Sequence, residues 1–167
     1  ARLYALGRAN ANDPDGHGTH VAGSVLGDGD SATLGHRIRG TAPAARLVLQ
    51  SVLDNGGGLG GLPDDLNGLF QPPYDDDGVR IHTNSWGSPV GDGRYTSNSR
   101  EVDEFVWEHR DCVICDSAGN EGVHHKTESG VIDPKSITPP ATAKNCITTG
   151  ATENDRPNFD LTYQQAF

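Results

Sequence analysis

The chain has 167 residues, of which 34% are hydrophobic, and its formal net charge at pH 7 is −10. This length suits one domain with its own core, and the negative charge opposes binding to nucleic acids or anionic membrane surfaces. No apolar run approaches the roughly 18 residues that a membrane span needs, and residues 1–11 lack the apolar core of a signal peptide.

Predicted strands and helices alternate along the chain. Short apolar or β-branched runs predict strands at 2–6, 46–53, 79–84, 112–117 and 146–151. Helices are expected at 16–26, from 63 to at least 70 with acidic residues in the first turn, and at 97–109. The last of these has an apolar stripe that includes Val102 and Phe105. Residues 28–39 are expected to form a polar loop and 55–61 a glycine-rich turn. The alternation predicts an α/β fold with a mostly parallel sheet covered on both faces.

Three cysteines are too few for a disulfide framework. Cys112 and Cys115 form a C-x-x-C, a spacing also found in redox pairs and zinc half-sites. Side chains three apart on a strand point to opposite faces, so the two sulfurs should diverge. Because no second C-x-x-C completes a metal site, we expect both to be small buried hydrophobic side chains.

Residues 15–23, Asp-Gly-His-Gly-Thr-His-Val-Ala-Gly, place His17 at the start of a predicted helix. Gly16 and Gly18 remove side-chain bulk on both sides of His17, so a substrate backbone could come close. Val21 and Ala22 begin an apolar run that is expected to bury the rest of the helix. This pattern indicates a reactive histidine held at the end of a rigid element.

Two further segments follow predicted strands directly. Asn84-Ser85-Trp86-Gly87 closes the strand at 79–84, and residues 116–122, Asp-Ser-Ala-Gly-Asn-Glu-Gly, close the cysteine-bearing strand. In open α/β sheets, functional groups gather beyond the carboxyl ends of the strands. Both segments are therefore candidates for a site.

In their order and spacing, these segments resemble those of the subtilisin-like serine proteases, the subtilases. The resemblance covers nearly the whole chain, and residues 148–153 are similar to a late core strand of that family. The sequence of residues 82–87, His-Thr-Asn-Ser-Trp-Gly, is most similar to that of the alkaline, oxidation-resistant branch of secreted bacterial subtilases. The resemblance implies a three-layer α/β fold with a mostly parallel central sheet, here incomplete at both ends, and an extracellular location.

The resemblance also implies a serine endopeptidase that works through an acyl-enzyme. His17 would be the general base, and the Asn120 amide would donate to the oxyanion. Residues 85–87 would pair with the substrate as an extra strand, and residues 57–61 would flank it. Residues 117–119 would line the primary specificity pocket together with Trp86 and Gly87. The substrate-binding residues would be Ser85, Trp86 and Gly87; Gly57, Gly58, Leu59, Gly60 and Gly61; and Ser117, Ala118 and Gly119.

The chain departs from the family pattern at the other two triad positions. No Asp-Ser-Gly or Asp-Thr-Gly precedes His17, no Gly-Thr-Ser-Met-Ala follows Asn120, and methionine is absent. Asp13 and Asp15 are too close to His17 to orient its ring, and we expect them to turn the chain and cap the helix.

We therefore expect residues 1–167 to be a partial peptidase domain. It would lack the Asp-bearing N-terminal strand and the Ser-bearing C-terminal helix, be inactive alone, and expose the apolar surface that the missing helix would cover. Its partners would be a protein or peptide substrate and the remainder of its own full-length chain.

Metal binding has only weak signals. His20 follows His17 by three residues, which allows a two-histidine metal site, but a packed helix residue is expected. Residues 125–133 resemble an eroded calcium loop or a surface insertion, and 75–77, Asp-Asp-Asp, are expected to form a solvated turn rather than a cation site. No cofactor is expected for catalysis and no metal ligand is assigned. The resemblance to subtilases also allows structural calcium in the full-length protein.

Two other functions are alternatives. The first is a non-catalytic, subtilase-derived module that binds peptides along Ser85–Gly87. The second is a Cys/His hydrolase using Cys112, Cys115 or Cys146, which is disfavoured because none of them lies at a glycine-rich strand-to-helix turn.

Overall fold

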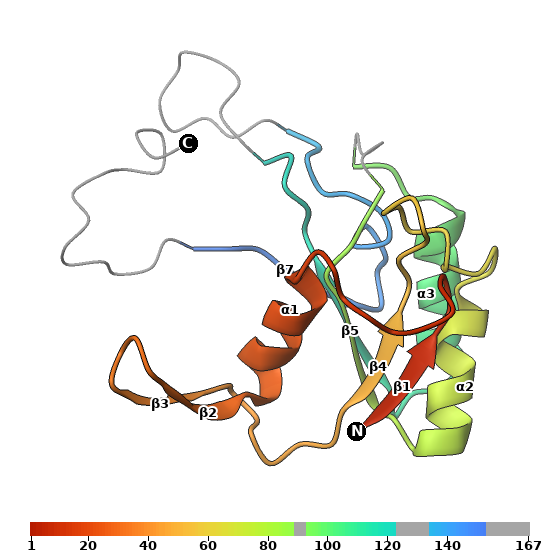
Figure 1. The fold of residues 1–167 in the computed structure, drawn as a ribbon. Coiled ribbons are helices and arrows are strands. Elements are labelled where there is room, and N and C mark those ends of the chain that lie inside the picture. The colour runs from red at the N-terminus through yellow and green to blue at the C-terminus, as the bar shows by residue number, and fades with distance from the viewer. Residues whose placement is uncertain (89–92, 123–133, 153–167) are drawn as a thin grey trace.

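The computed structural model describes residues 1–88, 93–122 and 134–152 (Figure 1). The elements in chain order are β1 (Arg2–Ala5), α1 (His17–Leu26), β2 (Asp28–Ser31), β3 (His36–Arg39), β4 (Val48–Ser51), α2 (Asn67–Asp77), β5 (Ile81–Asn84), α3 (Ser97–Glu108), β6 (Val113–Ser117) and β7 (Ile147–Thr149). Every predicted strand and helix is present, with ends shifted by a few residues. No helix in these ranges is long and apolar enough to cross a membrane.

The strands form mostly parallel sheets, which confirms the predicted α/β class. β1 pairs with β4 in parallel, and β5, β6 and β7 form a second parallel sheet in that order. In Figure 1, α2 and α3 lie on one side of β1, β4 and β5, and α1 lies on the other. The layered arrangement therefore places α1 apart from the other two helices.

The predicted polar loop at 28–39 is wrong, because β2 and β3 form an antiparallel hairpin there. The Asp28 carboxylate lies 2.7 Å from Arg37 Nε and 3.2 Å from Arg39 Nε, so ion pairs bridge the two strands. The hairpin buries no residue. It therefore has none of the apolar alternation by which strands are recognised in a sequence.

The core lies between α2, α3 and β6. Its buried members are Leu66, Leu69, Phe70, Val102, Phe105, Cys112 and Ile114. The apolar stripe of the third predicted helix supplies Val102 and Phe105, and the Phe105 ring centroid is 5.2 Å from that of Phe70. Burial of these large side chains is the main stabilising contribution in this half of the molecule.

Helix α2 begins later than predicted and extends well beyond residue 70. It begins at Asn67, after the acidic residues rather than before them, because the Asp65 carboxylate accepts the Asn67 backbone N–H at 2.9 Å. It then continues through two prolines to Asp77. Pro73 has no N–H for the Leu69 carbonyl, and Gln50 Nε2 donates to that carbonyl at 2.8 Å instead. A side chain on β4 thus replaces the missing helical hydrogen bond.

The sheet of β5, β6 and β7 is covered on one face only, within the described ranges. His82 and Ile114 face α2 and α3, whereas Ile81, Val113 and Ile147 are 72%, 41% and 56% exposed. The expectation of a sheet covered on both faces is therefore wrong for these residues.

The two C-x-x-C cysteines are free thiols with different surroundings. Cys112 is buried in the core, as predicted, but Cys115 is only half-buried. Burial raises the pKa of both thiols above the usual range, which keeps them protonated.

Candidate functional site

His17 is the first residue of α1, and Asp13 organises the turn before it. Asp13 Oδ1 accepts the Gly16 N–H at 3.0 Å, and Asp13 Oδ2 accepts the Thr19 N–H and hydroxyl, each at 2.7 Å. Gly16 has φ +82°, a left-handed conformation that favours glycine. The bonds from Thr19 and Gly16 lower the pKa of Asp13. The predicted capping role of Asp13 is thus confirmed.

The His17 side chain is exposed and makes no hydrogen bond within the described part of the chain. Two expectations for its helix are wrong. No residue of α1 is buried, since Val21 and Ala22 are only half-buried, and His20 is exposed rather than packed. The helix therefore presents His17 without a core beneath it.

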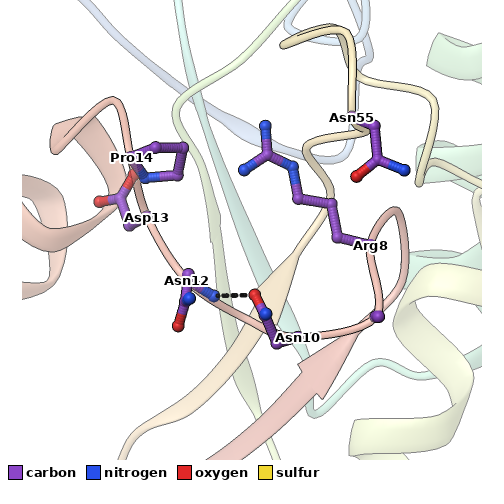
Figure 2. A pocket seen from close by; sticks show the side chains of 7 residues that line it. Arg8, Asn10, Asn12, Asp13, Pro14 and Asn55 are labelled. Atoms are coloured by element: carbon purple, nitrogen blue, oxygen red, sulfur yellow. Dashed lines mark hydrogen bonds between the residues drawn. The ribbon is translucent and has the colours of Figure 1, made fainter.

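A polar hollow of about 580 Å³ lies beside the N-terminus of α1 (Figure 2). The Arg8 side chain extends into it, with Asn55 on one side and Asp13 and Pro14 on the other. Arg8 Nε donates to the Asp54 carbonyl at 2.7 Å, which links the loop after β1 to the loop after β4. None of the predicted site residues lines this hollow.

A second pocket, of about 240 Å³, joins two of the predicted substrate-binding segments. Leu59 comes from the glycine-rich segment, and Trp86 and Gly87 come from the segment after β5. The remaining lining residues are Leu62, Ser88, Thr96, Asn98 and Pro139. Two leucines, a tryptophan and a proline make this pocket suitable for an apolar side chain.

The glycine-rich segment forms a turn, as predicted. Asp54 Oδ1 accepts the N–H groups of Gly56 and Gly58 at 2.8 and 2.9 Å, and these bonds lower the pKa of Asp54. A Cβ on Gly60 would lie 2.5 Å from Asp54 Oδ2, so the loop wraps tightly around this carboxylate. Leu59 is half-buried, whereas Gly57, Gly58 and Gly60 are exposed.

The two strand-end segments lie at the same edge of the sheet, as predicted. Asn84 and Asp116 are register partners, so the residues that follow them leave adjacent strands side by side. Gly119 has φ +102°, and the next residue, Asn120, is exposed. The backbone N–H of Asn120 donates to the Glu121 carboxylate at 2.9 Å.

Thr138 lies at the candidate site, and sequence reasoning missed it. Its side chain is 3% exposed, and its N–H donates to the Ala118 carbonyl at 3.1 Å. A Cβ on Gly87 would lie 2.7 Å from Thr138 Oγ1, and one on Gly119 would lie 2.5 Å from it. Thr138 therefore lies against both predicted pocket walls. No motif marks it, because only the fold brings it to them.

The structure provides no metal centre among the residues it describes, where no three His, Cys, Asp or Glu side chains are placed to hold an ion. The candidate loop at 125–133 lies outside the described residues. Asp75–Asp77 do not form a solvated turn, because they are the last turn of α2. Asp77 accepts hydrogen bonds from Tyr4 at 2.6 Å and Arg2 at 2.7 Å, which lower its pKa and tie α2 to β1.

Comparison with known proteins identifies the family of this chain. The profile of the subtilase family matches residues 3–165. The chain is 31% identical over 155 residues to the serine protease/ABC transporter B family protein tagD of Dictyostelium discoideum, covering 90% of this chain and 8% of that protein. It is 32% identical over 154 residues to the serine protease AprX of Bacillus subtilis, with coverage of 86% and 31%.

The chain is also 31% identical over 158 residues to subtilisin BL of Lederbergia lenta, with coverage of 93% of this chain and 50% of that protein. The chain thus spans half or less of the length of these three relatives.

Proposed function

Because the chain belongs to the subtilase family, we propose that it is part of a serine endopeptidase domain and supplies the general base and the substrate-binding walls. The triad aspartate and serine would come from sequence outside these 167 residues. The observation that carries the proposal is the convergence of the segments after β5 and β6 on Thr138, in a chain that also presents a capped, exposed His17.

In the proposed reaction, His17 removes the proton from the serine hydroxyl as that oxygen attacks the peptide carbonyl. The protonated imidazole then gives the proton to the leaving amine, which leaves an acyl-enzyme for water to hydrolyse. The Asn120 side-chain amide donates to the oxyanion, a contribution of about 10²–10³ in kcat in a comparable enzyme. Asp13 is already committed to the helix cap, so a different carboxylate must orient His17.

The substrate is proposed to be a polypeptide with two selected side chains. The pocket between Leu59 and Trp86 favours an apolar side chain. Thr138 occupies the space between Gly87 and Gly119, which limits the depth of the primary pocket and favours a small side chain there. Both preferences can be read from cleavage of a peptide library by the full-length protein.

The test uses a fluorophosphonate probe, which labels activated serines, on the 167-residue chain and on the full-length protein. We expect labelling of the full-length protein only. His17→Ala should abolish it, because triad members act as a unit and one loss costs about 10⁶ in kcat. His20→Ala is the matched control, since His20 is an exposed histidine one turn further along the same helix. Equal labelling of the two variants would refute the role of His17.

A peptide-binding module without catalysis is the second candidate, favoured by the preformed pocket at Trp86. Under this function, neither chain is labelled, yet peptides bind and Trp86→Ala weakens their binding. Labelling of the full-length protein would reject it.

An extracellular location and membership of the alkaline bacterial branch remain proposals. They are supported by the sequence of residues 82–87, while relatives from Dictyostelium discoideum, Bacillus subtilis and Lederbergia lenta match at 31–32% identity without singling out a branch. The presence of the protein in culture medium, and not only in cells, would test its location. Structural calcium is likewise a proposal, tested by loss of thermal stability of the full-length protein in a chelator.

A further inference from the structure

A row of polar side chains crosses the helix-covered face of the sheet, directly below the proposed pocket. Asn84, Asp116 and Thr148 are register neighbours on β5, β6 and β7. Asn84 and Asp116 lie at the carboxyl ends of β5 and β6, directly before Ser85 and Ser117, where the proposed pocket walls begin. Asn84 and Asp116 are buried close to the apolar core that includes Ile114, so their polar groups need hydrogen-bond partners.

The row is joined by short hydrogen bonds. Asn84 Nδ2 donates to Asp116 Oδ1 at 2.8 Å, and Asn84 Oδ1 lies 3.0 Å from His82 Nε2. The Asp116 side chain is 1% exposed, and its Oδ2 has no hydrogen-bond partner of acceptable geometry. The Asn84–Asp116 hydrogen bond therefore joins the residue before Ser85 to the residue before Ser117.

The row continues to the segment that carries Thr138. The Cys146 thiol lies beside Asp116 and is 3.5 Å from Thr148 Oγ1. Thr148 Oγ1 donates to the Ala141 carbonyl at 2.6 Å, three residues beyond Thr138. Polar contacts thus extend from Asn84 to Asp116, and from the neighbouring Cys146 thiol through Thr148 to Ala141.

Burial raises the pKa of Asp116, which favours a neutral carboxyl group over a buried charge. The Asn84 amide and the neighbouring Cys146 thiol act in the opposite direction on this pKa. No arginine or lysine pairs with Asp116 in the described residues. The group is therefore a hydrogen-bonding link and not an ion-pair partner.

We propose that Asp116 is a positioning residue that sets the spacing between the two walls and the floor of the primary specificity pocket. This inference rests on the proposed function for its effect on cleavage. Asp116 acts through Ser85–Gly87, Ser117–Gly119 and Thr138, and does not itself contact the substrate.

The test compares three variants of the full-length protein. Asp116→Ala removes the link, Asp116→Asn keeps its shape and replaces the carboxyl group with an amide, and Val102→Ala destabilises the same core without touching the row. The readout is the ratio of kcat/KM for peptides that differ only in having alanine or phenylalanine before the scissile bond. We expect Asp116→Ala to shift this ratio about tenfold, mainly through KM, and the other two variants to stay within about twofold of the parent.

Hydrogen exchange of the same full-length proteins gives a readout that needs no activity. Asp116→Ala should speed exchange at residues 85–88 and 117–119 together, and Asp116→Asn should restore protection. If Asp116→Ala and Val102→Ala leave equal ratios and equal exchange, the positioning role is wrong. If exchange follows Asp116 while no variant or parent cleaves any peptide, the proposed function fails and the structural link stands.

Discussion

The two regions that carry the proposed site are held in different ways. α1, which presents His17, has no buried residue, whereas the segments after β5 and β6 leave strands that pack on a core of buried leucine, valine and phenylalanine side chains. Local bonds hold α1: Asp13 caps its start, and the N–H groups of Gly40, Thr41 and Ala42 bond to carbonyls at its end at 2.7–3.1 Å. His17 is thus positioned by backbone and capping interactions, and the candidate pocket by tertiary packing.

The contrast predicts that stability and catalysis can be lost separately. A core substitution should unfold the pocket region, while a change in α1 should cost little stability but displace the histidine. The four predictions below apply to the full-length protein and run from the largest expected effect to the smallest.

Phe105→Ala should cause the largest loss, about 3–5 kcal/mol of unfolding free energy, by leaving a cavity. Phe105 is buried, its ring is tilted against Phe70, and it stacks on His109 with centroids 4.2 Å apart. Val21→Ala in α1 should cost about 1 kcal/mol or less, because Val21 is only half-buried. Urea unfolding of the two variants measures the difference, and equal losses would break the comparison.

His82 should make the pocket region sensitive to acid. Desolvation beside Phe70 lowers its pKa from 6.5 to about 4, so the folded protein holds it neutral. As pH falls, His82 is protonated first in the unfolded chain. The stability that neutral His82 contributes is therefore complete above pH 6.5 and is lost progressively as pH falls towards 4. The loss reaches about 3 kcal/mol at the lower limit.

Unfolding measured at several pH values between 4 and 7 tests this. His82→Gln should flatten the profile over that window, and His36→Gln, at an exposed position on β3, should leave it unchanged. A profile of the same slope after His82→Gln would assign the acid sensitivity to another group.

Asp13→Ala should cost about 1 kcal/mol, because it removes a helix cap and leaves the Thr19 N–H without its acceptor. The effect should be local, with faster hydrogen exchange at residues 17–20 and unchanged exchange in β5 and β6. Asp15→Ala is the neighbouring control with no such bond to α1. Exchange that rises equally in both regions would show that α1 is coupled to the core after all.

Asp28→Asn should have the smallest effect, about 1 kcal/mol or less, because the Asp28 pairs with Arg37 and Arg39 lie at the surface. Added salt should remove most of the difference from the parent. A larger loss that persists in salt would mean that the hairpin supports α1 more strongly than its exposure suggests. Urea midpoints at low and high salt give both numbers.

The elements that sequence reasoning placed well are those with a local signal. The stripe of Val102 and Phe105 indicated α3, and the β-branched runs indicated the parallel strands, because burial on one face leaves a period in the sequence. The β2–β3 hairpin has no buried face and left no such pattern. The extension of α2 through Pro73 was equally hidden, because Gln50 on a distant strand supplies the bond that proline cannot form.

The candidate site divides in the same way. Motifs around His17, Trp86 and Asn120 could be found because they are contiguous and depend on residue type. Thr138 and the connection through Asp116 could not be found, because their roles come from approaches across adjacent strands and a distant turn. The family itself was accessible from the order of the motifs, and the profile match over residues 3–165 confirms it.

The sequence by itself determined the α/β class, the family, the order of the helices and parallel strands, and the cap that holds His17, since each depends on neighbouring residues or on a short period. Tertiary structure alone decided that α1 stays exposed, that Thr138 lies between Gly87 and Gly119, and that a buried carboxyl links the strands below them. These features depend on contacts between residues far apart in the chain, and such contacts leave no periodic mark on either partner.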